Sequence, residues 1–301
     1  MTTWFERLLA QDAINFTLTN RIPRRWLTRV VGRVSRLEHP VIWKVSLALW
    51  QRFGGDLHLE EAAVQDFASV HACFTRALKP GARTIDRGPS TLVSPCDGIV
   101  GAAGRIHQGQ LFQAKGARYT LEDLLGGAEA APFEGGTYVT LRLTSAMYHR
   151  FHAPADLRLR STTFIPGELW NVNPVTVRRI PRLYCRNERA VLRTTTATGL
   201  ELLLVAVGAV LVGSIHVHAV GTPLNQEYGG PYHLPCAAEA DKGDELGYFH
   251  HGSTIIVIAT SRTRLCEGVT AGAAIRMGQA LLREDREERD HVGVPDSSGQ
   301  V

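Results

Sequence analysis

The sequence predicts an α+β protein with a mainly antiparallel β core and an N-terminal amphipathic helical arm. Two observations support this prediction. Within the first 80 residues, apolar and basic side chains recur at helical spacing, whereas from about residue 91 β-branched segments alternate with frequent turn signals. The pattern changes near residue 80, so we expect a helical region over 1–80 and a β-rich domain over 81–301.

The composition is that of an ordinary soluble globular chain. Of the 301 residues, 44% are hydrophobic and 21% are charged, which argues against general disorder and against a purely membrane-embedded protein. The five cysteines are scattered and form no CxxC pair, which argues against a disulfide framework and a structural zinc site. The sequence has neither a spanning apolar run nor a secretory signal pattern, so we expect the protein to stay inside the cell.

The N-terminal arm is strongly basic and amphipathic. On a helical template one face carries apolar side chains and another carries arginines. The apolar face holds Trp26, Val30, Val31, Val34 and Leu37, and the basic face holds Arg25, Arg29, Arg33 and Arg36. Such a helix can lie in an anionic lipid surface, with Trp26, Trp43 and Trp50 as interfacial anchors. A solvated helix packed on the domain explains the pattern as well, and nucleic acid is disfavoured because no known module accompanies the charge.

Three segments define the expected β core. Residues 137–144 alternate, residues 200–220 are β-branched and punctuated by glycine, and residues 254–260 form a short apolar run. One short helix is expected at "TLEDLLGG", where Thr120 and Asp123 resemble a capping box. The segment after about residue 284 is polar, and we expect it to be frayed.

Three polar stretches stand beside these strands: "SPCDGIV" (94–100), "MYHRFHAP" (147–154) and "HHGST" (250–254). A hydroxyl becomes a good nucleophile when a base takes its proton and a carboxylate orients that base. Ser253, one of His149 or His152, and Asp97 meet those needs. Each also has a plainer explanation, as a turn residue or a packed histidine, and spacing alone does not bring the three together.

Two other functional classes stay open at this point. His216 and His218 would share a strand face, and with His149 and His152 they could serve a metal-dependent hydrolase. A non-catalytic lipid-binding β domain would use only the basic arm. The segment Arg186–Arg189 could hold a phosphate or be an exposed turn.

A chain of separate motifs carries a resemblance to a known family. The motifs are "QAKGARYTLEDLL", "YHRFHAP", "IPGELWNVN", "YCRNERAVL", and "FHHGSTIIVIA" following "DKGDELGY". Together they resemble the bacterial membrane-associated phosphatidylserine decarboxylases, in the same order from about residue 24 to about residue 269. One departure is that His251 stands where the family commonly has leucine before Gly-Ser-Thr.

The resemblance implies a self-cleaving, pyruvoyl-dependent enzyme. The chain would cut itself between Gly252 and Ser253, giving a larger chain 1–252 and a smaller chain 253–301 whose first residue becomes a pyruvoyl group. This covalent ketone is the one cofactor expected, with no metal, and it would accept the electrons released with CO2 as phosphatidylserine becomes phosphatidylethanolamine. By analogy, His152 is the base for Ser253, Asp97 orients it, and His149 protonates the product.

The expected partners follow from this substrate. A two-tailed lipid is almost insoluble as a monomer, so the enzyme must work at a bilayer surface. We therefore expect a peripheral protein on the cytoplasmic side of the cell membrane, bound to anionic lipid through its basic arm. The two self-cleaved chains would form a heterodimer, further homo-oligomerisation stays open, and no nucleic acid is expected.

Overall fold

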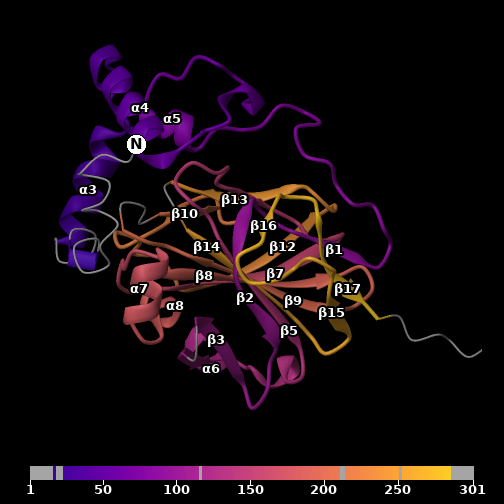
Figure 1. The fold of residues 1–301 in the computed structure, drawn as a ribbon. Helices are drawn as coiled ribbons and strands as arrows, with labels where there is room; N and C mark the ends of the chain where they lie inside the picture. Colours follow the sequence, from indigo (N-terminus) through magenta and orange to yellow (C-terminus); the bar gives the residue numbers. More distant parts are fainter. Residues whose placement is uncertain (1–15, 18–22, 115–116, 211–213, 251–252, 286–301) are drawn as a thin grey trace, which may run out of the picture.

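A computed structural model confirms the predicted α+β architecture, with helices gathered in the N-terminal region and antiparallel sheets after it (Figure 1). It describes residues 16–17, 23–114, 117–210, 214–250 and 253–285. The predicted tail after residue 284 therefore lies almost wholly outside the described residues.

The N-terminal region is built from short helices that pack on one side of the β core (Figure 1). They are α3 (Arg24–Val34), α4 (Pro40–Gly54), the 3-10 turn η1 (Leu59–Glu61) and α5 (Val70–Phe74). Pro40 begins α4 because its fixed φ suits the first helical position, and Gly55 ends it at a φ of 89°, a conformation that favours glycine.

The largest sheet has eight strands in the order β12-β7-β8-β9-β14-β5-β2-β16, and all its pairings are antiparallel. Its strands are β2 (Gly98–Arg105), β5 (Thr137–Arg142), β7 (Leu157–Ile165), β8 (Arg189–Thr196), β9 (Glu201–Val207), β12 (His233–Ala240), β14 (Thr254–Ala259) and β16 (Ala274–Ile275). The predicted strands at 137–144 and 254–260 are thereby confirmed as β5 and β14, and 200–220 contains β9 and β10.

Smaller sheets and helices surround this one. Three further sheets have the orders β1-β17-β15, β11-β10-β13-β6 and β3-β4. Their strands are β1 (Thr91–Val93), β3 (Gln110–Ala114), β4 (Ala117–Thr120), β6 (Arg150–His152), β10 (Ile215–Val217), β11 (Pro223–Leu224), β13 (Glu245–Phe249), β15 (Thr263–Leu265) and β17 (Ala280–Glu284). The remaining helices are α6 (Leu121–Leu125), η2 (Ala131–Phe133), α7 (Pro174–Arg179) and α8 (Leu183–Arg186).

β14 is buried along its whole length. Ile255, Ile256, Val257 and Ile258 are all fully buried, because β14 pairs with β5 on one side and β9 on the other. A strand buried on both faces needs a continuous apolar run of this kind. The residue that begins β14 is thus held at a fixed place by two neighbouring strands.

Two local predictions can be compared with the structure. Thr120 caps α6 as predicted, since its Oγ1 accepts a hydrogen bond of 3.0 Å from the Asp123 amide. The sequence allows either a phosphate site or an exposed turn at residues 186–189, and neither describes Arg189. This arginine is buried, and it donates to main-chain carbonyl oxygens of Leu124, Cys185, Asn187 and Asp123. Its guanidinium holds α6 and α8 against β8, so it is structural and unavailable to a phosphate.

The helical arm is amphipathic, but only one of its three predicted anchor tryptophans is exposed on its surface. Trp26 is 61% exposed, whereas Trp43 and Trp50 turn inward and their rings pack on Phe67 and Phe74. Trp43 and Trp50 are therefore wrong as interfacial anchors, because α5 and the segment before it cover their face of α4.

An apolar stripe occupies the opposite face of α4. Val41, Val45, Leu49 and Phe53 recur at every fourth position and are each more than half exposed. Within the described part of the chain, no helix combines the length and apolar character needed to cross a bilayer.

Candidate functional site

The polar stretches picked out in the sequence meet at one end of the eight-stranded sheet. In register, Arg142 of β5 lies opposite Ile99 of β2 and opposite Thr254 of β14, which in turn lies opposite Val207 of β9. Because neighbouring strands are antiparallel, the start of β2, the end of β5, the start of β14 and the end of β9 coincide. Asp97 and Ser253 directly precede two of these strands.

Ser253 directly precedes β14, and its hydroxyl has no partner among the described residues. The residue is fully buried, and its main-chain oxygen accepts a 2.9 Å hydrogen bond from the Leu143 amide. Among the described residues, nothing hydrogen bonds to its Oγ. A buried, unsatisfied hydroxyl is costly and calls for a functional reason. The other half of the predicted cleavage site, Gly252, lies outside the described residues, as does His251.

His152 is buried and held at both ring nitrogens. Its Nδ1 lies 2.9 Å from the Gly243 carbonyl oxygen, and its Nε2 lies 2.9 Å from the Tyr148 hydroxyl. Since a carbonyl only accepts, Nδ1 carries the proton in the neutral ring and Nε2 accepts from Tyr148. Burial lowers the pKa of His152, so the ring is neutral near neutral pH and Nε2 is its basic atom.

The carboxylate of Asp97 is bound to an arginine. Arg83 donates from Nε to Oδ1 at 3.0 Å and from Nη2 to Oδ2 at 2.6 Å, and the Met277 amide donates to Oδ1 at 2.9 Å. Arg83 also pairs with Glu61 at 2.8 Å, so this network ties the helical region to the sheet. The contacts of the described residues contain no hydrogen bond between Asp97 and His152. The catalytic role assigned to Asp97 stays a prediction, with Gly243 taking the orienting position at Nδ1.

His149 forms the boundary between the sheet and the helical region. It is fully buried, its main-chain oxygen accepts from the Phe249 amide at 3.0 Å, and its ring centroid lies 3.9 Å from that of Phe74 in α5. The main chain at His152 is tied to the opposite side, since its amide donates to Pro95 at 2.8 Å. Both predicted histidines therefore flank the same end of the sheet from one short segment.

A pair of stacked histidines that sequence reasoning did not bring together lies next to this region. The rings of His71 in α5 and His250 are 4.8 Å apart, with Nε2 of one 3.3 Å from Nδ1 of the other. They border a small cavity of about 190 Å³ whose wall includes Arg29, Arg33 and Arg36 of α3. No sequence signal marks His71, because its partner is distant in the chain.

The IPGELWNVN motif, whose role the sequence left open, is where α3 docks. Arg24 of α3 pairs with Glu168 at 3.2 Å, and its guanidinium carbon lies 3.6 Å from the centroid of the Trp170 ring. Arg29 pairs with Glu227 at 3.3 Å. Part of the basic face of α3 thus meets acidic residues of the β domain, whereas Arg33 and Arg36 remain exposed.

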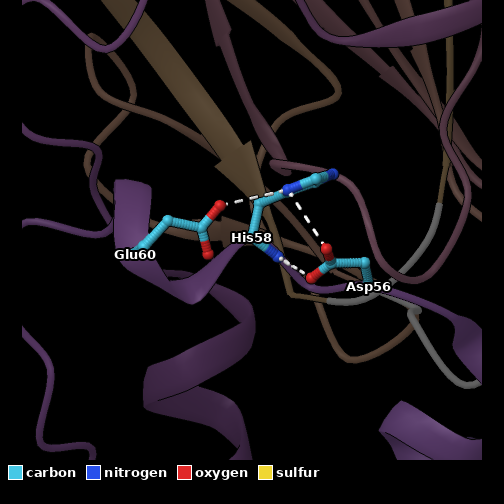
Figure 2. Close-up of side chains that lie close together, drawn as sticks. All are labelled: Asp56, His58 and Glu60. Atoms are coloured by element: carbon cyan, nitrogen blue, oxygen red, sulfur yellow. Dashed lines mark hydrogen bonds and ion pairs between the residues drawn. The ribbon is translucent and has the colours of Figure 1, made fainter.

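Within the described ranges, the histidines of the metal-dependent alternative are not brought together as a ligand set. They are His149, His152, His216 and His218. His218 Nε2 lies 2.7 Å from Glu245 Oε1, while both ring nitrogens of His152 are taken as described above. Among the residues that the structure describes, the group able to hold an ion is Asp56, His58 and Glu60, all exposed. Figure 2 shows this group, in which His58 Nδ1 lies 3.2 Å from Glu60 Oε1 and 3.5 Å from Asp56 Oδ2.

Comparisons with known proteins agree with the resemblance drawn from the motifs. A family model described as phosphatidylserine decarboxylase matches residues 70–283. A phosphatidylserine decarboxylase proenzyme of Halorhodospira halophila is 40% identical over 270 residues, covering 87% of this chain and 91% of the relative. Proteins of the same description from Shewanella baltica (38% identical over 283 residues; 90% and 96% covered) and Pseudomonas putida (39% over 278; 86% and 94%) are similar.

One prediction concerns His71, whose pKa is lowered to about 4, first by burial and then by the charge of Arg36. The unfolded chain takes up this proton near 6.5, so between pH 6.5 and about 4 it binds more protons than the folded chain. Stability therefore falls as the pH is lowered through this window. Replacing His71 with Gln should reduce that loss by on the order of 1 kcal/mol, allowing for solvent screening of a half-buried ring.

The measurement is the urea concentration at the midpoint of unfolding, at pH 7 and at pH 5. It is made in a Ser253→Ala chain, which we expect to remain a single polypeptide because it cannot cleave itself. An equal loss of stability in the His71→Gln chain and its parent would contradict the assignment.

Proposed function

As this chain belongs to the phosphatidylserine decarboxylase family, we propose that it converts phosphatidylserine to phosphatidylethanolamine and CO2 with a pyruvoyl group made from its own Ser253. Family membership makes it a carboxy-lyase of phospholipid metabolism. The observation that carries the finer proposal is the buried Ser253 hydroxyl at the mouth of β14, which has no partner among the described residues.

The surroundings of Ser253 fit a pyruvoyl group. A ketone carries no charge and no donor, so it can stand where a hydroxyl finds no acceptor among the described residues. The strand that follows is buried along its whole length and paired on both sides, which would hold the new chain end in place. Once formed, the pyruvoyl ketone supplies an electrophilic carbon for the substrate amine and an acceptor for the electron pair that loss of CO2 releases.

Self-cleavage would begin with an attack by Ser253 on its own backbone. Its Oγ adds to the Gly252 carbonyl carbon as the C–N bond breaks, giving an ester and a free amine; His152 Nε2 takes the hydroxyl proton. Loss of the Cα proton then expels the Gly252 carboxylate with the C–O electron pair. The resulting dehydroalanine becomes an imine, which takes up water and releases ammonia to leave the ketone. The products are chains 1–252 and 253–301, which would remain together as a heterodimer.

His152 suits the base in this reaction because burial keeps it neutral and Gly243 leaves the Nε2 lone pair available. Tyr148 occupies that lone pair at rest, so its hydroxyl must turn away or pass the proton on. Asp97 supports the protonated ring through its charge, which acts to raise the pKa of His152 against the effect of burial. In this proposal the negative charge of Asp97 stabilises the protonated ring of His152, and Arg83 holds the Asp97 carboxylate in place.

His149 is the proposed proton donor to the product carbon. An imidazole can hold a proton and return it to a reacting atom in a closed site. Its contact with Phe74 excludes water from one side of the ring. This role is separate from that of His152, which acts before the ketone exists.

The helical region 1–80 is proposed to attach the enzyme to the cytoplasmic face of the cell membrane. The exposed stripe of α4 (Val41, Val45, Leu49 and Phe53) offers an apolar face, and the exposed arginines of α3 offer charge to anionic lipid. The β-rich domain 81–301 would then face the bilayer through this region, which also walls the predicted site.

The first prediction from this proposal concerns the cleavage itself. The purified protein should run as two chains under denaturing conditions, the smaller one beginning at 253 with a blocked N-terminus. Ser253→Ala should remain a single full-length chain without turnover, because it lacks the attacking oxygen. Ser161→Ala, which removes another buried hydroxyl from the same sheet, should cut normally. Intact mass measures all three, and a cleaved Ser253→Ala chain would falsify the mechanism.

The second prediction separates the two histidines. His152→Asn and Asp97→Asn should slow self-cleavage by about 100-fold or more, as expected for loss of a base or its support. His149→Gln should still yield two chains but lose at least about 100-fold in decarboxylation. His233→Asn, an exposed histidine on β12, is the control and should change neither. The roles would be exchanged if the His149→Gln chain stayed uncut while the His152→Asn chain was cut but inactive.

The third prediction concerns the membrane face. Leu49→Asp should weaken binding to vesicles containing anionic phosphatidylglycerol by about 10-fold or more, since an apolar side chain would no longer be buried in lipid. Val64→Asp, which changes an equally exposed valine outside α4, is the matched control. Raising the salt concentration should weaken binding of the parent chain. Equal vesicle binding by the Leu49→Asp, Val64→Asp and parent chains would rule out this face.

A further inference from the structure

A cavity beside the predicted site lies between the helical region and the end of the sheet. Its volume is about 420 Å³, and its wall includes Val31 of α3, Trp50 of α4, Phe74 of α5 and Leu143 after β5. Most of the described side chains around it are apolar. Among them Arg142 alone carries a charge, and none is acidic. An amphipathic ligand with one anionic group matches this lining.

Arg142 is a cation with no counter-ion among the described residues, in a partly closed site. Its side chain is half-buried, and among the described residues its guanidinium makes neither a hydrogen bond nor an ion pair. Burial lowers its pKa, although an arginine remains charged throughout the physiological range. Other arginines away from full exposure do have partners: Arg83 and Arg150 each bind a carboxylate, and the buried Arg189 donates to main-chain carbonyl oxygens. Taking an unpaired charge out of water is expensive, so such a site favours an anion.

Two residues of the cavity wall, Leu143 and Phe74, contact residues on which the proposed function depends. Arg142 lies opposite Thr254, and the neighbouring Leu143 donates its amide to the Ser253 carbonyl oxygen. On another wall, the Phe74 ring packs on His149. Trp50 belongs to α4, whose outer face carries the exposed apolar stripe. A ligand here would therefore extend from the proposed membrane face toward the start of β14.

We propose that Arg142 binds the phosphodiester of the lipid substrate in this cavity and so positions the serine headgroup beside residue 253. The inference rests on the proposed function, because it takes the lipid as the substrate. Guanidinium groups bind phosphate oxygens through two parallel hydrogen bonds, which fixes orientation as well as affinity. The phosphate and the amine of the headgroup are separated by only two carbons and an oxygen, so anchoring one end restricts the other.

The phosphodiester is favoured over the substrate carboxylate by the chemistry of the reaction. The carboxylate loses its charge as CO2 departs, so a cation held against it would stabilise the starting state more than the transition state and slow the reaction. The phosphodiester keeps its charge throughout. A contact with the phosphodiester therefore strengthens substrate binding without raising the barrier to decarboxylation. A strong charge–charge interaction can then lie beside the reacting atoms without slowing the reaction.

The test measures binding without catalysis, in the full-length Ser253→Ala chain, by calorimetric titration with dihexanoyl phosphatidylserine and dihexanoyl phosphatidylethanolamine. Arg142→Gln should weaken both lipids by about 10- to 100-fold, as expected for loss of a charge-assisted bond. Arg142→Lys should recover part of that loss. Arg264→Gln removes an arginine that is 60% exposed on β15 and should change neither affinity.

A loss confined to phosphatidylserine would overturn the assignment to the phosphodiester, since the ethanolamine lipid lacks the carboxylate. Unchanged affinities in Arg142→Gln would overturn the site altogether. Because the Ser253→Ala chain has no ketone, these outcomes do not depend on self-cleavage. In the cleaved enzyme, Arg142→Gln should raise KM with kcat little changed, and a fall in kcat at unchanged KM would contradict a binding role.

Discussion

The register of four neighbouring strands is the constraint on which the rest of the structure depends. β2, β5, β14 and β9 are aligned so that Ile99, Arg142, Thr254 and Val207 form one row across the sheet. A slip of one residue would turn every side chain of a strand to the opposite face. Because β14 is buried along its whole length and paired with a strand on each side, such a slip is strongly disfavoured. Ser253 is therefore held at a fixed distance from Asp97 and from the segment after β5.

The helical region does more than cover this end of the sheet. Glu61 and Asp97 share Arg83, Phe74 packs on His149, and His71 stacks on His250. Each contact joins a residue of the first 80 positions to a residue at or beside the predicted site. Displacing the helices would uncover two histidines and take from Arg83 one of its two carboxylate partners, Glu61. In the proposed function, the surface that meets lipid and the wall of the site are the same short helices.

Local patterns predicted the elements well, since they depend on neighbouring residues. The apolar run at β14, the alternation at β5, the Thr120 cap and the amphipathic α3 all follow from spacing that can be seen in the sequence. The motifs also picked out Asp97, His149, His152 and Ser253, which the register brings to one end of the sheet. The motifs did not predict which hydrogen bonds these four residues form.

The missed contacts depend on packing between distant segments. Arg83 binds Asp97, and Gly243 and Tyr148 bind His152, none of which any spacing rule connects. The inward direction of Trp43 and Trp50 depended on which face of α4 the next helix would cover. In the sequence, Arg142 is an ordinary charged residue at the end of a strand, and only its surroundings in the structure show that its charge has no partner among the described residues.

The most direct measurement is peptide mapping of the purified enzyme after reduction with borohydride. The account predicts that the segment containing β14 begins at residue 253 and carries a former ketone, reduced to a secondary alcohol. A peptide that runs unbroken from His250 through Ser253 in fully active protein, with no reducible carbonyl, would contradict it.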